Sequence, residues 1–313
     1  AMKIVAIETH HIVVPGSIGA TAVGFAGTAW SGMNTLFLRI VTDQGLDGWG
    51  EGFGHASCSA TRAVLDRQLG PMLLGQDARD IAGLYRRMGQ ALHLYGRNGP
   101  HMHALSAMDV ALWDIAGKQA GLPLWRLLGA SPPGTHEAYA SLLRYGNGRA
   151  IGAAVERAVA QGYQHLKLHE VDHEPIAAAR VAAGPGPRIM LDTNCPWTVD
   201  EAIAMARKLQ PLDLAWLEEP VWPPEDFAGL ARVRREGGIP IAAGENAQGA
   251  MDFRAAFDAG ALDVAQPSVA KIGGVSAMMA IAGLAESRGV RLIPHCAYFG
   301  PGFLASLHLH ARL

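Results

Sequence analysis

The chain has 313 residues, half of them apolar, and its 26 basic and 28 acidic side chains leave a formal net charge of −2, so it can bury one large core or two modest ones. Because acids and bases are interspersed, the charge pattern does not favour a nucleic acid or a membrane surface as a partner. The three scattered cysteines argue against a disulfide framework, and no apolar run is long enough for a signal peptide or a membrane span, so we expect a cytoplasmic protein.

The N-terminal part, residues 2–131, predicts an α+β domain. Residues 3 to 14 and 35 to 43 alternate between apolar and polar side chains, and a Gly-Leu-Asp-Gly turn leads into a third strand at residues 49 to 51, as in an antiparallel meander. The loop between the first two strands, residues 15–33, is rich in Gly, Ala and Ser. A loop of that length in a compact domain is usually mobile or functional, so we expect a lid.

Three helices are expected next, over residues 60 to 69, 81 to 95 and 106 to 120. We expect Ser106 to cap the N-terminus of the third helix and Gly121 to end it. The Ser-Pro-Pro-Gly run that begins at Ser131 then predicts the boundary to a second domain, residues 132–313.

The second domain alternates strands with helices, which is typical of βα units around a parallel sheet. We expect seven strands, at residues 136 to 143, 165 to 170, 188 to 193, 214 to 219, 240 to 245, 263 to 268 and 291 to 296. A closed barrel of this kind has eight units and about 250 residues. We therefore expect an α/β fold with a modified (β/α)8 TIM barrel that is apparently truncated, its eighth unit missing from this chain.

Three of the expected strands end in an acidic residue, at Asp192, Glu218 and Glu245. The carboxyl ends of parallel strands converge, and two like charges about 4 Å apart there would cost on the order of 4 kcal/mol. A bound cation would offset this repulsion, and an all-oxygen ligand set favours Mg²⁺. Each acid alone could equally cap the helix that follows it, but three successive units that end alike favour a metal site.

Seven motifs, taken in order along the chain, resemble the enolase superfamily in its mandelate racemase and muconate-lactonizing branch. They are SAMDVALWDIAGK at 106–118, KLH at 167–169, DTN at 192–194, WLEEP at 216–220, GEN at 244–246, KIGG at 271–274 and PH at 294–295. The resemblance implies an N-terminal α+β capping domain over a modified barrel, with the active site between them.

The resemblance also implies a chemistry, in which the proton α to a carboxylate is removed and the resulting enediolate is stabilised on Mg²⁺. Asp192, Glu218 and Glu245 match the three ligand positions of the family. Asn194 matches a position that often helps to orient the substrate or a metal-bound water. The implied partner is therefore a small-molecule carboxylate.

The candidate bases lie on two strands. Lys167 and His169 alternate along one strand and so both point into the barrel; in the related pattern the second place holds the base and the first contacts the substrate carboxylate. His169 could alternatively be a structural histidine. His295 matches the base of the racemase-like branch, which an Asp at the end of the sixth strand normally supports. Ser268 stands there instead, so we expect a weaker base or one supported by another residue.

Ser268 also argues against the muconate-lactonizing and dipeptide-epimerase activities, which use a Lys at this position. Lys271 lies three residues later in the following loop, where it is either a substrate contact or a surface cation. His55, Arg144 and Tyr298 are further candidates for contact with the substrate.

We expect a Mg²⁺-dependent enzyme that acts on a small hydroxy-carboxylate, with acid-sugar dehydration as the leading hypothesis. One general acid–base histidine can serve both steps of a dehydration, whereas 1,1-proton transfer needs two bases on opposite faces of the substrate. The alternatives are a racemase or epimerase that uses His169 and His295, and a metal-binding homologue without turnover. The resemblance further favours a homo-oligomer.

Overall fold

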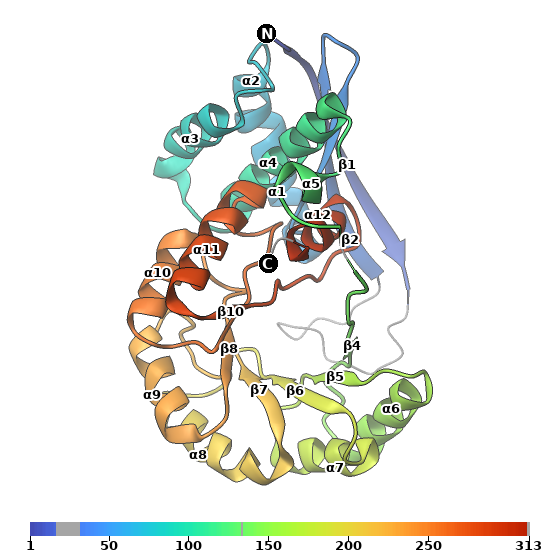
Figure 1. Cartoon of the computed structure of the whole chain (residues 1–313), viewed down its shortest axis with the longest axis vertical. Coiled ribbons are helices and arrows are strands. Elements are labelled where there is room, and N and C mark those ends of the chain that lie inside the picture. Colours follow the sequence, from blue (N-terminus) through green and yellow to red (C-terminus); the bar gives the residue numbers. More distant parts are fainter. Residues whose placement is uncertain (17–31, 133, 312–313) are drawn as a thin grey trace.

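The structure, a computed structural model, describes residues 1–16, 32–132 and 134–311. The lid expected at residues 15–33 therefore lies almost entirely outside the described residues. Figure 1 shows two units, one built on an antiparallel sheet and one on a curved parallel sheet. Within the described ranges, every helix is too short or too polar to cross a lipid bilayer.

The antiparallel sheet has the strand order β1-β2-β3 and confirms the predicted meander. Its strands are β1 (Ile4–Pro15), β2 (Gly32–Thr42) and β3 (Asp47–Gly52). Leu36, Leu38 and Ile40 are fully buried at every second position of β2, because alternate side chains of a strand point to the same face. This face belongs to the apolar core of the capping unit.

Helices pack on that face and confirm the unit as α+β. They are η2 (His55–Ser57), α1 (Cys58–Val64), η3 (Leu65–Leu69), α2 (Gly70–Leu73), α3 (Ile81–Leu92), η4 (His93–Tyr95), α4 (Gly99–Ala120) and α5 (Leu124–Leu127). The prediction that Ser106 caps a helix is wrong, because α4 already begins at Gly99. Ser106 lies inside the helix, where its hydroxyl donates to the Met102 carbonyl oxygen at 2.7 Å. The predicted end is confirmed, since Gly121 is left-handed with φ 64°.

The long helix α4 lies directly against the backbone of β3. A Cβ at Gly50 would come within 1.9 Å of the Ala107 carbonyl oxygen, and a Cβ at Gly48 within 2.1 Å of the Ala111 carbonyl oxygen. The two glycines face the helix together because they are two residues apart on the strand. Their lack of side chains is what lets the helix pack this closely.

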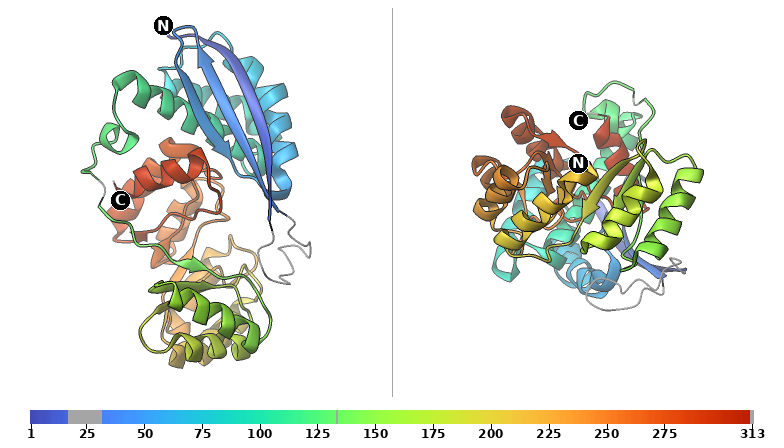
Figure 2. Two further views of the ribbon diagram at one scale, coloured as in Figure 1. Left: turned by 90° about the vertical axis from the view of Figure 1, so that its right-hand side faces the viewer. Right: turned by 90° about the horizontal axis from the view of Figure 1, so that it is seen from below.

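The parallel sheet has seven strands in the described part of the chain, in the order β10-β9-β8-β7-β6-β5-β4, and confirms the predicted βα succession. The strands are β4 (Ala140–Ser141), β5 (His165–Leu168), β6 (Arg188–Asp192), β7 (Leu214–Glu218), β8 (Ile241–Ala243), β9 (Val264–Ala265) and β10 (Arg291–Leu292). The helices are α6 (Gly148–Ala160), α7 (His173–Ala183), α8 (Val199–Leu209), α9 (Phe227–Gly237), α10 (Ala250–Asp258), α11 (Gly274–Arg288) and α12 (Pro301–His310). Seen from below, the green to orange helices lie along the outer side of the strands (Figure 2).

The parallel strands bury two different faces. One face belongs to the large core shared with the helices and includes Leu166, Ile189, Leu191 and Leu217. The other face carries a small separate cluster made of Met190, Trp216, Ala242 and Val264. Asp192 and Glu218 each follow a member of this second cluster by two residues, so both acids project to the side away from the helices.

Polar contacts join the two units. Asp109 in α4 accepts hydrogen bonds from the hydroxyl and the backbone N–H of Ser276 in α11, at 2.6 and 2.9 Å. At the other end of the chain, the N-terminal turn of α12 is held by Glu51 of β3, whose Oε2 accepts from Gly302 N–H at 2.9 Å. Helix α12 thus packs back onto the capping unit, and the boundary that we place after residue 131 stays a prediction.

Candidate metal centre

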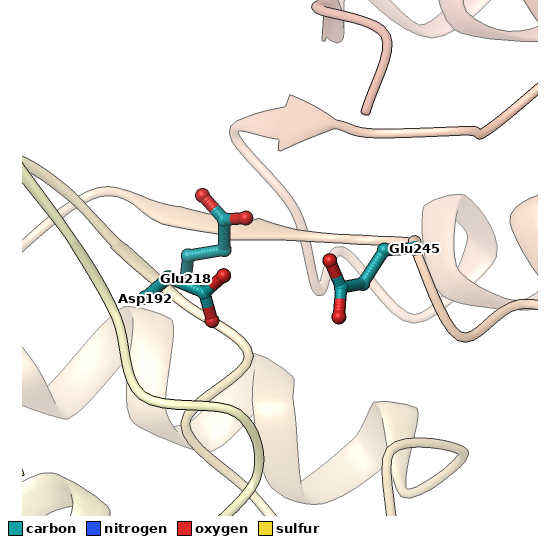
Figure 3. Close-up of side chains that lie close together, drawn as sticks. All are labelled: Asp192, Glu218 and Glu245. Atoms are coloured by element: carbon teal, nitrogen blue, oxygen red, sulfur yellow. The ribbon is translucent and has the colours of Figure 1, made fainter. Parts of the chain in front are cut away.

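Three acidic side chains meet at the carboxyl ends of β6, β7 and β8. Asp192 and Glu218 are the last residues of β6 and β7, and Glu245 follows the end of β8 by two residues. Each offers one carboxylate oxygen, and these oxygens all lie within 4.8 Å of one another. Figure 3 shows the three side chains close together. The structure therefore brings together the residues that the sequence singles out as metal ligands, and their role as ligands is a proposal.

Lys167 lies inside this acid cluster. Its Nζ is 2.5 Å from Glu218 Oε1 and 2.9 Å from Asp192 Oδ2, and its side chain is only 5% exposed. Burial by itself would lower the pKa of Lys167, but the attraction of Glu218 and then of Asp192 outweighs burial and raises the pKa well above its usual value. Lys167 is therefore a fixed positive charge in this arrangement rather than a proton acceptor.

The second oxygen of Glu218 is held by two neighbours that sequence reasoning did not assign to the site. Trp216 Nε1 and Gln266 Nε2 both donate to Glu218 Oε2 at 2.9 Å. The position of Trp216, two residues before Glu218 on the same strand, was the available signal. Burial raises the pKa of Glu218 against the opposing attraction of Lys167. The all-oxygen donors of the cluster suit Mg²⁺.

His169 faces the cluster from the β5 side. Its Nδ1 lies 2.6 Å from the Leu142 carbonyl oxygen, and because a carbonyl only accepts, Nδ1 carries the proton in this contact. Its Nε2 lies 3.5 Å from Asp192 Oδ2. Arg144, another predicted candidate, donates to the His169 carbonyl oxygen at 2.6 Å and so orients the backbone rather than the ring.

His295 faces the cluster from the β10 side. Its Nε2 lies 2.9 Å from Glu245 Oε2. Burial acts against ionisation of Glu245, but the charge of His295 outweighs it and holds the pKa of Glu245 at about 2. Nδ1 of His295 is buried and finds no hydrogen-bond partner among the described residues. Among the described residues, His295 therefore contacts an acid through Nε2 and has no acidic partner at Nδ1; whether another residue supports it as a base stays a prediction.

Ser268 lies three residues after β9, which ends at Ala265 and not at the expected residue 268, and its partner is Tyr298. Its hydroxyl lies 3.1 Å from the Tyr298 hydroxyl. The same Tyr298 hydroxyl donates to the His295 carbonyl oxygen at 3.2 Å and accepts from Ala270 N–H at 3.3 Å. Ser268 and Tyr298 therefore hold the backbone of His295 in place and do not contact its imidazole through these hydrogen bonds.

Asn194 and Lys271 lie at the edges of the cluster. Asn194 is left-handed with φ 57°, its N–H donates to Asp192 Oδ1 at 3.1 Å, and its side-chain Oδ1 is buried without a hydrogen-bond partner among the described residues. Lys271 Nζ lies 4.7 Å from the centre of the Phe53 ring, and its charge contributes to the lowered pKa of Glu245. Lys271 thus faces the cluster from the loop after β9, against an aromatic side chain of the capping unit.

Glu219 is a buried acid that the sequence analysis left without a role. Its Oε1 accepts from Gly244 N–H at 2.9 Å and its Oε2 from Cys195 Sγ at 3.3 Å. Burial, followed by the nearby charge of Glu245, raises the pKa of Glu219 to about 7. Glu219 follows the end of β7 with a left-handed φ of 45°, and its carboxylate ties together the loops that follow β6 and β8.

Known proteins are similar to this chain over both units. Residues 10–129 match the family described as mandelate racemase / muconate lactonizing enzyme, N-terminal domain, and residues 150–313 match enolase C-terminal domain-like proteins. D-galactarolactone cycloisomerase of Agrobacterium fabrum is 36% identical across 100% of this chain and 83% of its own length. Arabinonate dehydratase of Saccharolobus solfataricus is 32% identical across 93% of this chain and 80% of its own length. A racemase from Streptomyces coelicolor A3(2) with bound magnesium has a solved structure that covers 98% of this chain and 86% of its own at a TM-score of 0.89 and 32% identity.

Proposed function

The chain belongs to the mandelate racemase and muconate-lactonizing branch of the enolase superfamily, and from this premise we propose that it removes the proton α to the carboxylate of an acid sugar and then expels the β-oxygen. The observation that supports this most is the buried acid cluster with histidines on both sides. His169 approaches it from β5 and His295 from β10.

Asp192, Glu218 and Glu245 would hold a Mg²⁺ ion, which when bound supplies positive charge where the substrate carboxylate gathers negative charge. Lys167 adds a second positive charge in the same place and is suited to bind the substrate carboxylate. Such charge is needed because the α-proton of a carboxylate is too weakly acidic for an ordinary side chain to remove unaided.

The hydrogen bonds of the two histidines favour different roles. His169 commits its Nδ1 proton to the Leu142 carbonyl oxygen, so Nε2, which lies 3.5 Å from Asp192 Oδ2, is the atom through which its ring exchanges a proton with the substrate. His295 Nε2 contacts the ionised Glu245 and so carries a proton, which it gives to the departing β-oxygen. The pair of histidines thereby takes one proton and supplies one, as general acid–base catalysis of an elimination requires.

The β-oxygen of the substrate decides how the reaction is classified. A free hydroxyl leaves as water, which is a dehydration, whereas a ring oxygen stays attached to the carbon chain, which is an isomerisation. Similar proteins named as a cycloisomerase of D-galactarolactone and a dehydratase of arabinonate support acid sugars as the substrate class for both outcomes. Dehydration is the outcome that we propose first.

A racemase or epimerase is the second candidate, and the placement of His169 and His295 on opposite sides of the cluster favours it. Such an enzyme would remove the α-proton with one histidine and return a proton with the other. In D₂O it would place deuterium in the recovered substrate and form no 2-keto product.

The test is to incubate the Mg²⁺-loaded protein in D₂O with a panel of aldonates, aldarates and their lactones and to follow the α-proton and the products by NMR. We expect metal-dependent loss of the α-proton with formation of a 2-keto acid, and loss of this activity in His169→Ala and His295→Asn. His10→Asn, which alters an exposed histidine of β1, is the matched control. A panel in which no acid sugar reacts while another carboxylate is turned over would refute the proposal.

A further inference from the structure

A second cavity lies in the capping unit, outside the acid cluster. It has a volume of about 510 Å³ and is bounded by α3, the loop that carries η4, and the first turns of α4. Leu92, Met102 and Leu105 form apolar parts of its wall, and Arg86 and Arg97 lie at its edge. No residue of the proposed reaction contributes to its lining, so the cavity is separate from the proposed metal centre.

The cavity lining carries positive charge without compensation. None of its residues is acidic, and neither Arg86 nor Arg97 forms an ion pair with any described residue. Arg87, the neighbour of Arg86 on α3 that does not line the cavity, is paired with Asp80 at 3.0 Å. The two arginines of the cavity therefore keep their full capacity to bind an anion.

A buried polar atom in the same lining also lacks a partner. Nε2 of His101 is shielded from solvent and makes no hydrogen bond with the described residues, while its ring stacks on Tyr95 with centroids 6.2 Å apart. Buried polar atoms without partners are uncommon in native proteins, and a bound ligand is one of the groups that can satisfy them. This supports an occupant with a hydrogen-bonding group, such as a carboxylate.

We propose that this cavity binds a small organic carboxylate with an apolar body. The carboxylate pairs with the guanidinium groups of Arg86 and Arg97, and the apolar body rests on Leu92, Met102 and Leu105. Inorganic phosphate would meet the same guanidinium groups but would leave the apolar wall uncovered, so burial of apolar surface favours the organic anion.

The proposal is tested by isothermal titration calorimetry of the full chain without divalent metal, using 3-phenylpropionate, its uncharged amide and inorganic phosphate as probes. We expect 3-phenylpropionate to bind at least about tenfold more tightly than either of the other two, since each lacks one of the two interactions. Equal affinity for phosphate, or no detectable binding of 3-phenylpropionate at millimolar concentration, would overturn the proposal.

Substitutions in the cavity lining test whether 3-phenylpropionate binds there. Arg86→Gln and Arg97→Gln alter exposed side chains that form no ion pair with the described residues. Each should lower the affinity for 3-phenylpropionate by about tenfold, whereas Arg67→Gln in η3 should leave the affinity unchanged. Gly89→Leu fills the cavity from α3, where a Cβ would meet only Leu105 Cδ2 at 3.9 Å, and should abolish binding while the melting temperature is kept. If all these variants bind as the parent does, the carboxylate sits elsewhere and the proposal is wrong.

Discussion

Lys167 is the residue on which the charge balance of the acid cluster depends. It contacts two of the three carboxylates at once, and its place was predictable because it alternates with His169 along one strand. What the alternation could not reveal is that both contacts are made to the proposed metal ligands. Removing one member of a buried ion pair is costly because the remaining charge stays buried and unpaired.

Replacement of Lys167 with Met, which keeps most of the side-chain volume and removes the charge, should lower the free energy of unfolding of the metal-free protein by about 3 to 5 kcal/mol. Mg²⁺ should stabilise the variant more than it stabilises the parent protein, because Asp192 and Glu218 then lack the ammonium group that contacts both. Urea unfolding with and without Mg²⁺ measures both effects. Lys271→Met is the control, since Lys271 rests on an aromatic ring; a loss as large in the control would contradict the explanation.

At the scale of elements, the contact between α4 and α11 shows how a single acid joins the two units. Asp109 is fully buried and accepts hydrogen bonds at the first turn of α11, from the N–H and hydroxyl of Ser276. The sequence predicted a helix here but made Ser106 its first residue. Local capping rules predicted that the helix starts at Ser106. In the structure the Ser106 hydroxyl instead accepts a hydrogen bond at 2.8 Å from the N–H of Gly273, which lies far along the chain.

Asp109 gives the fold a specific pH dependence. Burial raises the pKa of Asp109 from 3.8 to about 7, against the smaller opposing effect of its hydrogen bonds. The carboxyl is protonated in both states at low pH; as the pH rises from about 4 to about 7, the unfolded chain ionises first. The free energy of unfolding should therefore fall across this window, by on the order of 4 kcal/mol.

Asp109→Asn removes this titration and can keep the hydrogen bonds to Ser276, because an amide both donates and accepts. Urea unfolding between pH 4.5 and 8 measures the free energy of unfolding of the parent and of the variant. The variant should become more stable relative to the parent as the pH rises. All other titrating groups are shared, so they cancel in the difference. A difference that stays constant with pH would show that Asp109 is not the responsible group.

At the scale of the whole molecule, the proposed metal site depends on the assembled sheet. Its three acids come from β6, β7 and the loop after β8, so the unfolded chain cannot present them together. Metal binding should therefore stabilise the folded state alone. A homo-oligomer and a cytoplasmic location stay predictions at this scale.

Mg²⁺ at about 100 times its dissociation constant should raise the free energy of unfolding by about 2.7 kcal/mol. Differential scanning calorimetry over a Mg²⁺ series should show the melting temperature rising with concentration. Glu245→Gln should lose most of this response because one ligand charge is gone. Glu225→Gln, at an exposed position in the loop after β7, should respond as the parent does, and an equal response in Glu245→Gln would exclude Glu245 as a ligand.

The sequence by itself determined the succession of strands and helices, though not the bounds of every strand, and that Asp192 and Glu218 end two neighbouring strands. These features follow from local alternation of side chains and from the order of βα units, both of which are properties of short stretches of chain. The same pattern of strand ends named Glu245 as the third acid, and the family motifs added the candidate bases. For these reasons, the fold and the three acids could be named before the structure.

Only the tertiary structure decided which groups these residues contact. Lys167 bridges β5 to β6 and β7, His295 takes Glu245 as its partner, and Ser268 turns to Tyr298. Each of these contacts joins segments that lie far apart in the chain, and their geometry depends on how the strands curve and stagger rather than on local propensity. The same reason applies to the start of α4 at Gly99, seven residues before the predicted start at Ser106. That start depends on what packs against the helix.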